Sequence, residues 1–86
     1  MDGRALIAWN LRKIRVAKGL SQEKLAADAG VDRAYLAKLE RRSVNAGVDV
    51  LDKLVLALGV TLAELFEVPI EGAIPPAPLR GGRKKS

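Results

Sequence analysis

Cysteine and histidine are both absent from this 86-residue sequence. Without cysteine there can be no disulfide and no thiolate-bound zinc, and without histidine the commonest general base and the commonest metal ligand are missing. A serine–histidine triad is excluded for the same reason. The acidic residues show no spacing typical of a catalytic pair or a metal site. We therefore predict a protein that is not an enzyme and needs no metal and no cofactor.

Long hydrophobic runs are also missing, although 49% of the residues are hydrophobic. No stretch approaches the ~18 apolar residues of a membrane-spanning helix. The apolar stretch at residues 5–9 is too short for the core of a signal peptide, and Asn10 and Arg12 follow it at once. We expect no membrane association and a cytoplasmic location.

Positive charge is unevenly distributed along the chain, whose formal net charge is +5. Residues 1–48 hold ten Lys or Arg and five acids, residues 49–71 one Lys and five acids, and residues 72–86 four basic residues and no acid. The basic first half favours a polyanionic partner, with nucleic acid first and an anionic membrane second.

A three-residue pattern of glycine, an aliphatic residue and a helix-capping residue occurs three times. Glycine just past a helix accepts the left-handed conformation, and Ser, Asp or Thr two residues later caps the next helix. Glu64 also follows Thr61 at the capping-box spacing. The three copies are Gly19-Leu20-Ser21, Gly30-Val31-Asp32 and Gly59-Val60-Thr61.

These signals and the apolar spacing predict an all-α fold of five short helices and no strand. We expect a compact domain over residues 1–68. Residues 69–86 contain all four prolines and three glycines, which is typical of a disordered tail. The five helices are predicted at residues 6–18, 22–29, 33–41, 48–58 and 62–67.

The second and third predicted helices are joined by a linker short enough to turn the chain sharply. Ala26 is small where the helices would cross, Gly30 stands at the turn, and Val31 can fill the gap between them. A helix-turn-helix requires this arrangement, but an ordinary helical hairpin could also contain it.

Residues 11–66 resemble the helix-turn-helix domain of phage lambda repressor and Cro-type (XRE-like) regulators. Residues 32–36, with Glu40 and Arg41, are also similar to the controller proteins of restriction–modification systems. The sequence has Arg42 where the family often has glycine, so either the third helix is longer or Arg42 is left-handed. The matching segments are Leu11-Arg12-x-x-Arg15, Gly19-Leu20-Ser21-Gln22-Glu23-x-Leu25-Ala26, Gly30-Val31-Asp32, Leu39-Glu40-Arg41 and Leu51-x-x-Leu54-x-x-Ala57-Leu58-Gly59-Val60-x-Leu62-x-x-Leu65-Phe66.

The resemblance implies a lambda-repressor-like fold whose third helix reads base edges. It implies that Arg33, Ala34 and Lys38 face the bases, where Arg33 can donate two hydrogen bonds to guanine and Ala34 can touch a thymine methyl. It also implies a salt bridge between Arg15 and Glu40. The expected phosphate-binding residues are Gln22, Tyr35, Arg41, Arg42, Ser43 and Asn45, although Tyr35 could instead pack across the second helix.

The apolar residues near the end of the predicted domain are expected to divide between core and surface. Trp9 should be partly buried, and Leu65 and Phe66 should lie in the core. Leu62, Val68 and Ile70 would leave an apolar edge that suggests a dimer contact.

We therefore predict a homodimeric regulator, either a repressor or a controller-type autoregulator, on a pseudo-palindromic DNA operator. The alternative is a protein-interaction module, such as an antitoxin or an anti-activator, whose tail or acidic fourth helix binds a partner protein.

Overall fold

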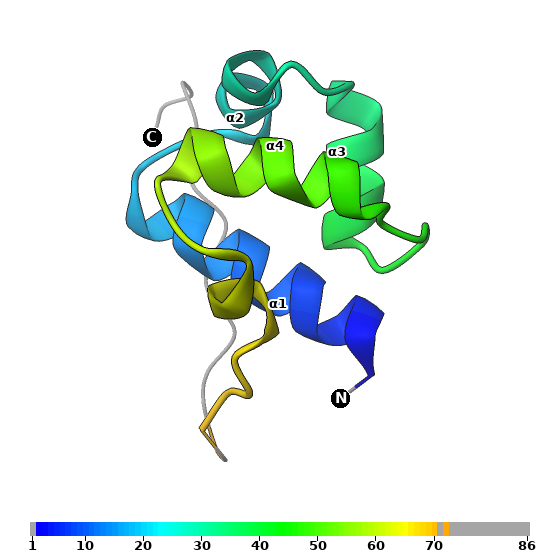
Figure 1. Cartoon of the computed structure of the whole chain (residues 1–86), viewed down its shortest axis with the longest axis vertical. Helices are drawn as coiled ribbons and strands as arrows, with labels where there is room; N and C mark the ends of the chain where they lie inside the picture. Colours follow the sequence, from blue (N-terminus) through cyan, green and yellow to red (C-terminus); the bar gives the residue numbers. More distant parts are fainter. Residues whose placement is uncertain (1, 71, 73–86) are drawn as a thin grey trace, which may run out of the picture.

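The computed structural model describes residues 2–70 and residue 72, and in this part of the chain every regular element is helical and no strand occurs. None of its helices combines the length and the hydropathy needed to cross a bilayer. Most of the predicted disordered tail lies outside the described residues. The elements are α1 (Gly3–Ala17), α2 (Gln22–Ala29), α3 (Arg33–Glu40), α4 (Val48–Leu58) and the 3-10 helix η1 (Leu62–Phe66) (Figure 1).

The predicted count of five helices is corrected, because the fifth element is a single short 3-10 helix. Pro69 has no N–H and cannot continue a helix, so the element ends before it. The side chain of Asn10 donates to the Leu65 carbonyl over 2.9 Å, which satisfies one of the free carbonyls at the helix end. The Thr61 hydroxyl also makes no capping bond, so the expected capping box does not form.

The other helix boundaries follow the local signals closely. Ser21 Oγ accepts from the Lys24 N–H over 3.0 Å and caps α2, and Asp32 Oδ2 accepts from the Tyr35 N–H over 2.9 Å and caps α3. The beginning of α1 was predicted three residues too late. Asp2 caps this helix through a 2.9 Å bond from the Ala5 N–H, which adds a turn that apolar spacing alone does not reveal.

All four α-helices end in the same hydrogen-bonded turn, in which a left-handed residue closes the helix. Glycine holds this position after α1, α2 and α4, with φ of 71–72°. After α3 the residue is Arg42, with φ of 64°. The Arg42 N–H donates to the Leu39 carbonyl (3.1 Å) and the Ser43 N–H to the Lys38 carbonyl (2.9 Å). Of the two possibilities at Arg42, the left-handed one is therefore found, and α3 ends at Glu40.

The core receives one fully buried leucine from every element, and these side chains meet between the helices. The helices lie around this cluster, with α1 and η1 on one side and α2, α3 and α4 on the other (Figure 1). Burial of these side chains is the main stabilising term for so short a domain. The five residues are Leu11, Leu25, Leu36, Leu54 and Leu65.

Three predictions about burial near η1 have different outcomes. Trp9 is half-buried as expected. Phe66 is 44% exposed rather than in the core, whereas Leu62 packs against the core rather than forming an exposed edge. The reason is the 3-10 geometry, because three residues per turn place Leu62 and Leu65 on one side and direct Phe66 away from it.

Candidate nucleic-acid interface

Helices α2 and α3 form the helix-turn-helix unit on one side of the molecule. Ala26 is buried at 2% exposure, and Val31 packs against the core. The small residue and the aliphatic residue therefore lie where a helix-turn-helix requires them. Gly30, with φ of 72°, reverses the chain between the two helices.

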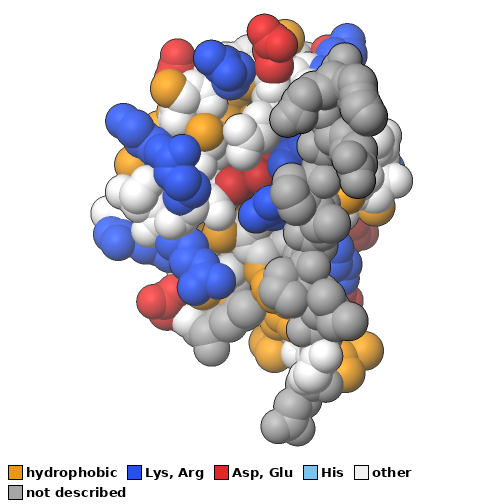
Figure 2. All heavy atoms as spheres, turned by 180° about the vertical axis from the view of Figure 1, so that it is seen from behind, with side chains coloured by type: hydrophobic (Ala, Val, Ile, Leu, Met, Phe, Trp, Pro, Cys, Tyr) orange, Lys and Arg blue, Asp and Glu red, His pale blue; other side chains and the backbone are white. Residues whose placement is uncertain are grey.

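The outer surface of α3 carries the predicted base-reading residues. Arg33, Ala34 and Lys38 are all exposed. Among the described residues, neither Arg33 nor Lys38 forms an ion pair, so their cationic groups remain available for an anionic ligand. Figure 2 shows Lys and Arg side chains gathered along the edge of the molecule on which α3 lies.

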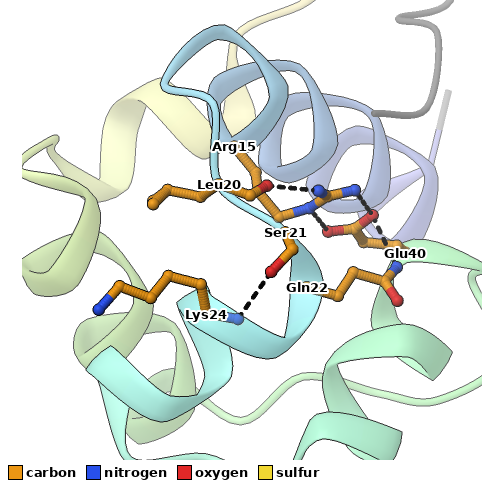
Figure 3. A network of polar contacts seen from close by, with 6 residues as sticks. All are labelled: Arg15, Leu20, Ser21, Gln22, Lys24 and Glu40. Atoms are coloured by element: carbon orange, nitrogen blue, oxygen red, sulfur yellow. Dashed lines mark hydrogen bonds and ion pairs between the residues drawn. The ribbon is translucent and has the colours of Figure 1, made fainter. Parts of the chain in front are cut away.

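Behind this surface lies a polar network that joins α1, α2 and α3 (Figure 3). Arg15 donates to both carboxylate oxygens of Glu40, from Nε to Oε2 over 2.7 Å and from Nη2 to Oε1 over 2.9 Å. Their side chains are 5% and 3% exposed. The third guanidinium nitrogen, Nη1, donates to the Leu20 carbonyl over 2.7 Å. This network fixes the end of α3 against α1.

Gln22, the first residue of α2, contacts the same network. Its Nε2 donates to Glu40 Oε1 over 3.1 Å, so its side chain bridges α2 and α3. One amide hydrogen of Gln22 remains for another acceptor. Gln22 thus links the first turn of α2 to the buried ion pair of Arg15 and Glu40.

The segment from residue 41 to residue 47 is held by side chains at both ends. Tyr35 Oη donates to the Asn45 carbonyl over 2.6 Å, and Ser43 Oγ donates to the Lys38 carbonyl over 3.2 Å. Each hydroxyl has one hydrogen, which is already donated, so neither can donate to a phosphate in this conformation. The expectation that Tyr35 and Ser43 bind phosphate stays a prediction, and it requires these hydroxyls to change partners or another group of either residue to donate.

The remaining predicted phosphate residues are arranged differently. Arg41 and Arg42 are exposed and form no ion pair within the described part of the chain. Asn45 is also exposed, and its Oδ1 accepts from Arg4 Nε over 2.7 Å, while its amide N–H groups have no acceptor among residues 2–70 and 72. The two arginines thus retain the strongest capacity for an anion.

Two residues of this arrangement have roles that the sequence does not predict. Asn10 is buried and donates to the carbonyls of Leu65 and Glu67 over 2.9 and 2.8 Å. Arg4 reaches Asn45 across the fold. Their partners are 55, 57 and 41 residues away in the sequence, and no local pattern marks such contacts.

The chemical groups of this surface are suited to binding an anion. Within the described residues no group of three acidic side chains is placed to hold a metal ion. What the surface offers is guanidinium, ammonium and amide donors on a rigid helix, which suits an extended anion.

Comparisons with known proteins agree on one family. The sequence profile of the HTH_3 helix-turn-helix family matches residues 11–65. A hypothetical transcription factor of Neisseria meningitidis is 43% identical over 70 residues, which cover 81% of this chain and 66% of that protein. Control protein C.BamHI of Bacillus amyloliquefaciens is 37% identical over 65 residues, which cover 74% of this chain and 80% of that protein.

Solved structures show the same likeness in three dimensions. The restriction–modification controller protein C.AhdI of Aeromonas hydrophila has a TM-score of 0.71 at 41% identity, covering 73% of this chain and 96% of that one. The controller protein C.Esp1396I, solved as a tetramer with its natural 35-base-pair operator, has a TM-score of 0.70 at 30% identity. That match covers 77% of this chain and 87% of the controller chain.

Proposed function

Since the chain belongs to the HTH_3 (XRE-type) family of DNA-binding helix-turn-helix transcriptional regulators, we propose that it is a cytoplasmic, sequence-specific regulator that inserts α3 into the major groove. The observation that carries this proposal is the exposed outer surface of α3, whose cationic side chains have no ion-pair partner in the described part of the chain. The proposal is also supported by the positive charge of the Lys and Arg side chains that gather along this edge of the molecule (Figure 2). The protein acts by occupying DNA and not by catalysis.

Base reading in this proposal rests on three residues of the first two turns of α3. Arg33 donates two hydrogen bonds to guanine O6 and N7, Ala34 contacts a thymine methyl group, and Lys38 reaches the groove one turn later. Asp32 is not assigned to a base, because its carboxylate accepts from the Tyr35 N–H and caps α3.

Backbone binding in this proposal is shared between both ends of the helix-turn-helix. Gln22 offers an amide hydrogen at the beginning of α2, and Arg41, Arg42 and Asn45 offer donors just beyond α3. Tyr35 and Ser43, whose hydroxyl hydrogens are already donated, hold this segment in shape instead. Arg15 and Glu40 keep α1 and α3 in register beneath the reading surface.

The proposed regulator is a homodimer on a pseudo-palindromic operator, because one module contacts only a few base pairs. The controller relatives favour a controller-type autoregulator or repressor. Residues 1–68 form the DNA-binding unit and residues 69–86 a separate tail. The exposed apolar side chains of Phe66, Val68 and Ile70 supply a candidate dimer surface.

Selection of binding sites from random duplex DNA tests this function. Arg33→Ala is expected to relax the preference at one guanine position and to cost about 1–3 kcal/mol of discrimination. Lys53→Ala, which removes an exposed charge on α4, is the control and should leave the selected sequence unchanged. A wild-type affinity that does not fall with rising salt, or a selection that enriches no sequence, would refute the proposal.

A further inference from the structure

The first turn of α1 approaches the segment that follows α3. Arg4 Nε donates to Asn45 Oδ1 over 2.7 Å, and both side chains are exposed. The two residues lie 41 positions apart in the sequence. A guanidinium from the first turn of the domain is therefore held at the very segment to which the proposed function assigns backbone binding.

Only part of the Arg4 guanidinium is used in this contact. An arginine has five N–H donors, and Nε contributes a single one, so Nη1 and Nη2 keep four. Among the described residues no carboxylate forms an ion pair with Arg4. The nearest acid in the sequence, Asp2, directs Oδ1 to the Ala5 N–H as the helix cap.

The segment that Arg4 contacts is basic. Residues 41–48 contain two arginines and no acid, and the carboxylate that precedes them, Glu40, is buried and bonded to Arg15. Phosphate oxygens prefer the planar, multiply donating guanidinium, and a side chain already fixed by one hydrogen bond loses less rotational freedom on binding.

We propose that Arg4 is a DNA phosphate-binding residue positioned by Asn45. This inference rests on the proposed DNA-binding function and extends its contact surface from the helix-turn-helix to the first turn of α1. Asn45 then has two roles, since its Oδ1 orients Arg4 while its amide N–H groups form no hydrogen bond within the described residues.

The salt dependence of DNA binding separates this role from a purely structural one. Arg4→Gln removes the charge but keeps an amide that can bond Asn45, and it is expected to lower the log–log slope by about one per bound protomer. Arg4→Lys keeps the charge and should retain the slope. Lys13→Gln is the matched control, because it removes one charge from the same helix at a residue paired loosely with Glu67 (3.9 Å).

Each outcome of this experiment has a distinct meaning. An unchanged slope for folded Arg4→Gln, with a steep slope for the wild type, overturns the role of Arg4 and leaves the proposed function standing. Equal losses in Arg4→Gln and Lys13→Gln also overturn it, since they indicate net charge alone. A wild-type slope near zero defeats the DNA-binding function itself. Thermal unfolding of each variant verifies that the domains compared are folded.

Discussion

The ion pair of Arg15 and Glu40 is the most deeply buried charged group among the described residues. A buried pair is not by itself strongly stabilising, because removing both charges from water costs nearly as much as their attraction returns. Here, however, the hydrogen-bonding groups of the pair are well satisfied. Both Glu40 oxygens and all three guanidinium nitrogens have partners, so a change at one partner leaves several groups without one.

Glu40→Ala is expected to destabilise the domain by about 3–5 kcal/mol, because it leaves the Arg15 charge buried and unpaired. Chemical denaturation followed by circular dichroism measures this loss. The surface pair of Lys24 and Asp28, 3.1 Å apart and largely exposed, supplies the control. Asp28→Ala should cost about 0.5 kcal/mol or less. Similar losses of unfolding free energy in the two variants would show that the pair of Arg15 and Glu40 stabilises the domain no more than a surface ion pair.

At the residue scale, the sequence predicts what is local and misses what is not. The caps at Ser21 and Asp32 could be predicted because donor and acceptor are three residues apart. The pairing of Arg15 with Glu40 was expected only from family resemblance. The role of Asn10 could not be predicted, since it donates hydrogen bonds to two carbonyls that only the folded chain brings near it.

At the scale of elements, the four α-helices end in the same turn, but one of the four left-handed residues is an arginine and not a glycine. A left-handed residue costs arginine roughly 1–2 kcal/mol that glycine does not incur. Arg42, with φ of 64°, carries this strain beside the proposed backbone-binding residues. The strain is consistent with a side chain kept for its charge.

Arg42→Gly is therefore expected to stabilise the domain by about 1 kcal/mol and to weaken DNA binding at the same time. Thermal unfolding measures the first effect and the salt slope of binding the second. Gly59 has nearly the same φ after α4 and serves as the reverse control, since Gly59→Arg should destabilise the domain. A destabilised Arg42→Gly variant would contradict this explanation.

The helix boundaries were predicted more accurately than the last element. The bounds of α2 and α4 were predicted without error: a left-handed glycine ends both helices, and Ser21 caps the beginning of α2. For η1 the sequence shows the apolar spacing but neither the 3-10 geometry nor the hydrogen bond from Asn10 of another helix to the Leu65 carbonyl. This difference also explains why Phe66 was placed in the core.

At the scale of the whole molecule, the apolar side chains left on the surface bear on assembly. Val68 is 74% and Ile70 is 85% exposed, and both follow η1, where Asn10 holds the Glu67 carbonyl. Such side chains are costly in water and are typical of contacts between subunits. Figure 1 shows the segment after η1 on the opposite side of the molecule from α3, which carries the proposed base-reading residues.

Replacing Val68 and Ile70 together by serine is expected to weaken dimerisation at least tenfold, because each buried aliphatic side chain contributes about 1.5–3 kcal/mol. Sedimentation equilibrium measures the change. Leu56→Ser, at an exposed apolar position on α4 (84%), is the control. If only Leu56→Ser dissociates the dimer, the subunits meet through α4 and not through the segment after η1.

The outer surface of α3 has a consequence for how such a regulator can diversify. Among the described residues, the side chains of Arg33, Ala34 and Lys38 form no hydrogen bond or ion pair within the fold, whose stability comes from the opposite side of the helix and from the turns at its two ends. If these residues read the bases as proposed, substitutions at their positions change the preferred operator at little cost in folding free energy. A duplicated copy could thus acquire a new target sequence while its scaffold remains intact.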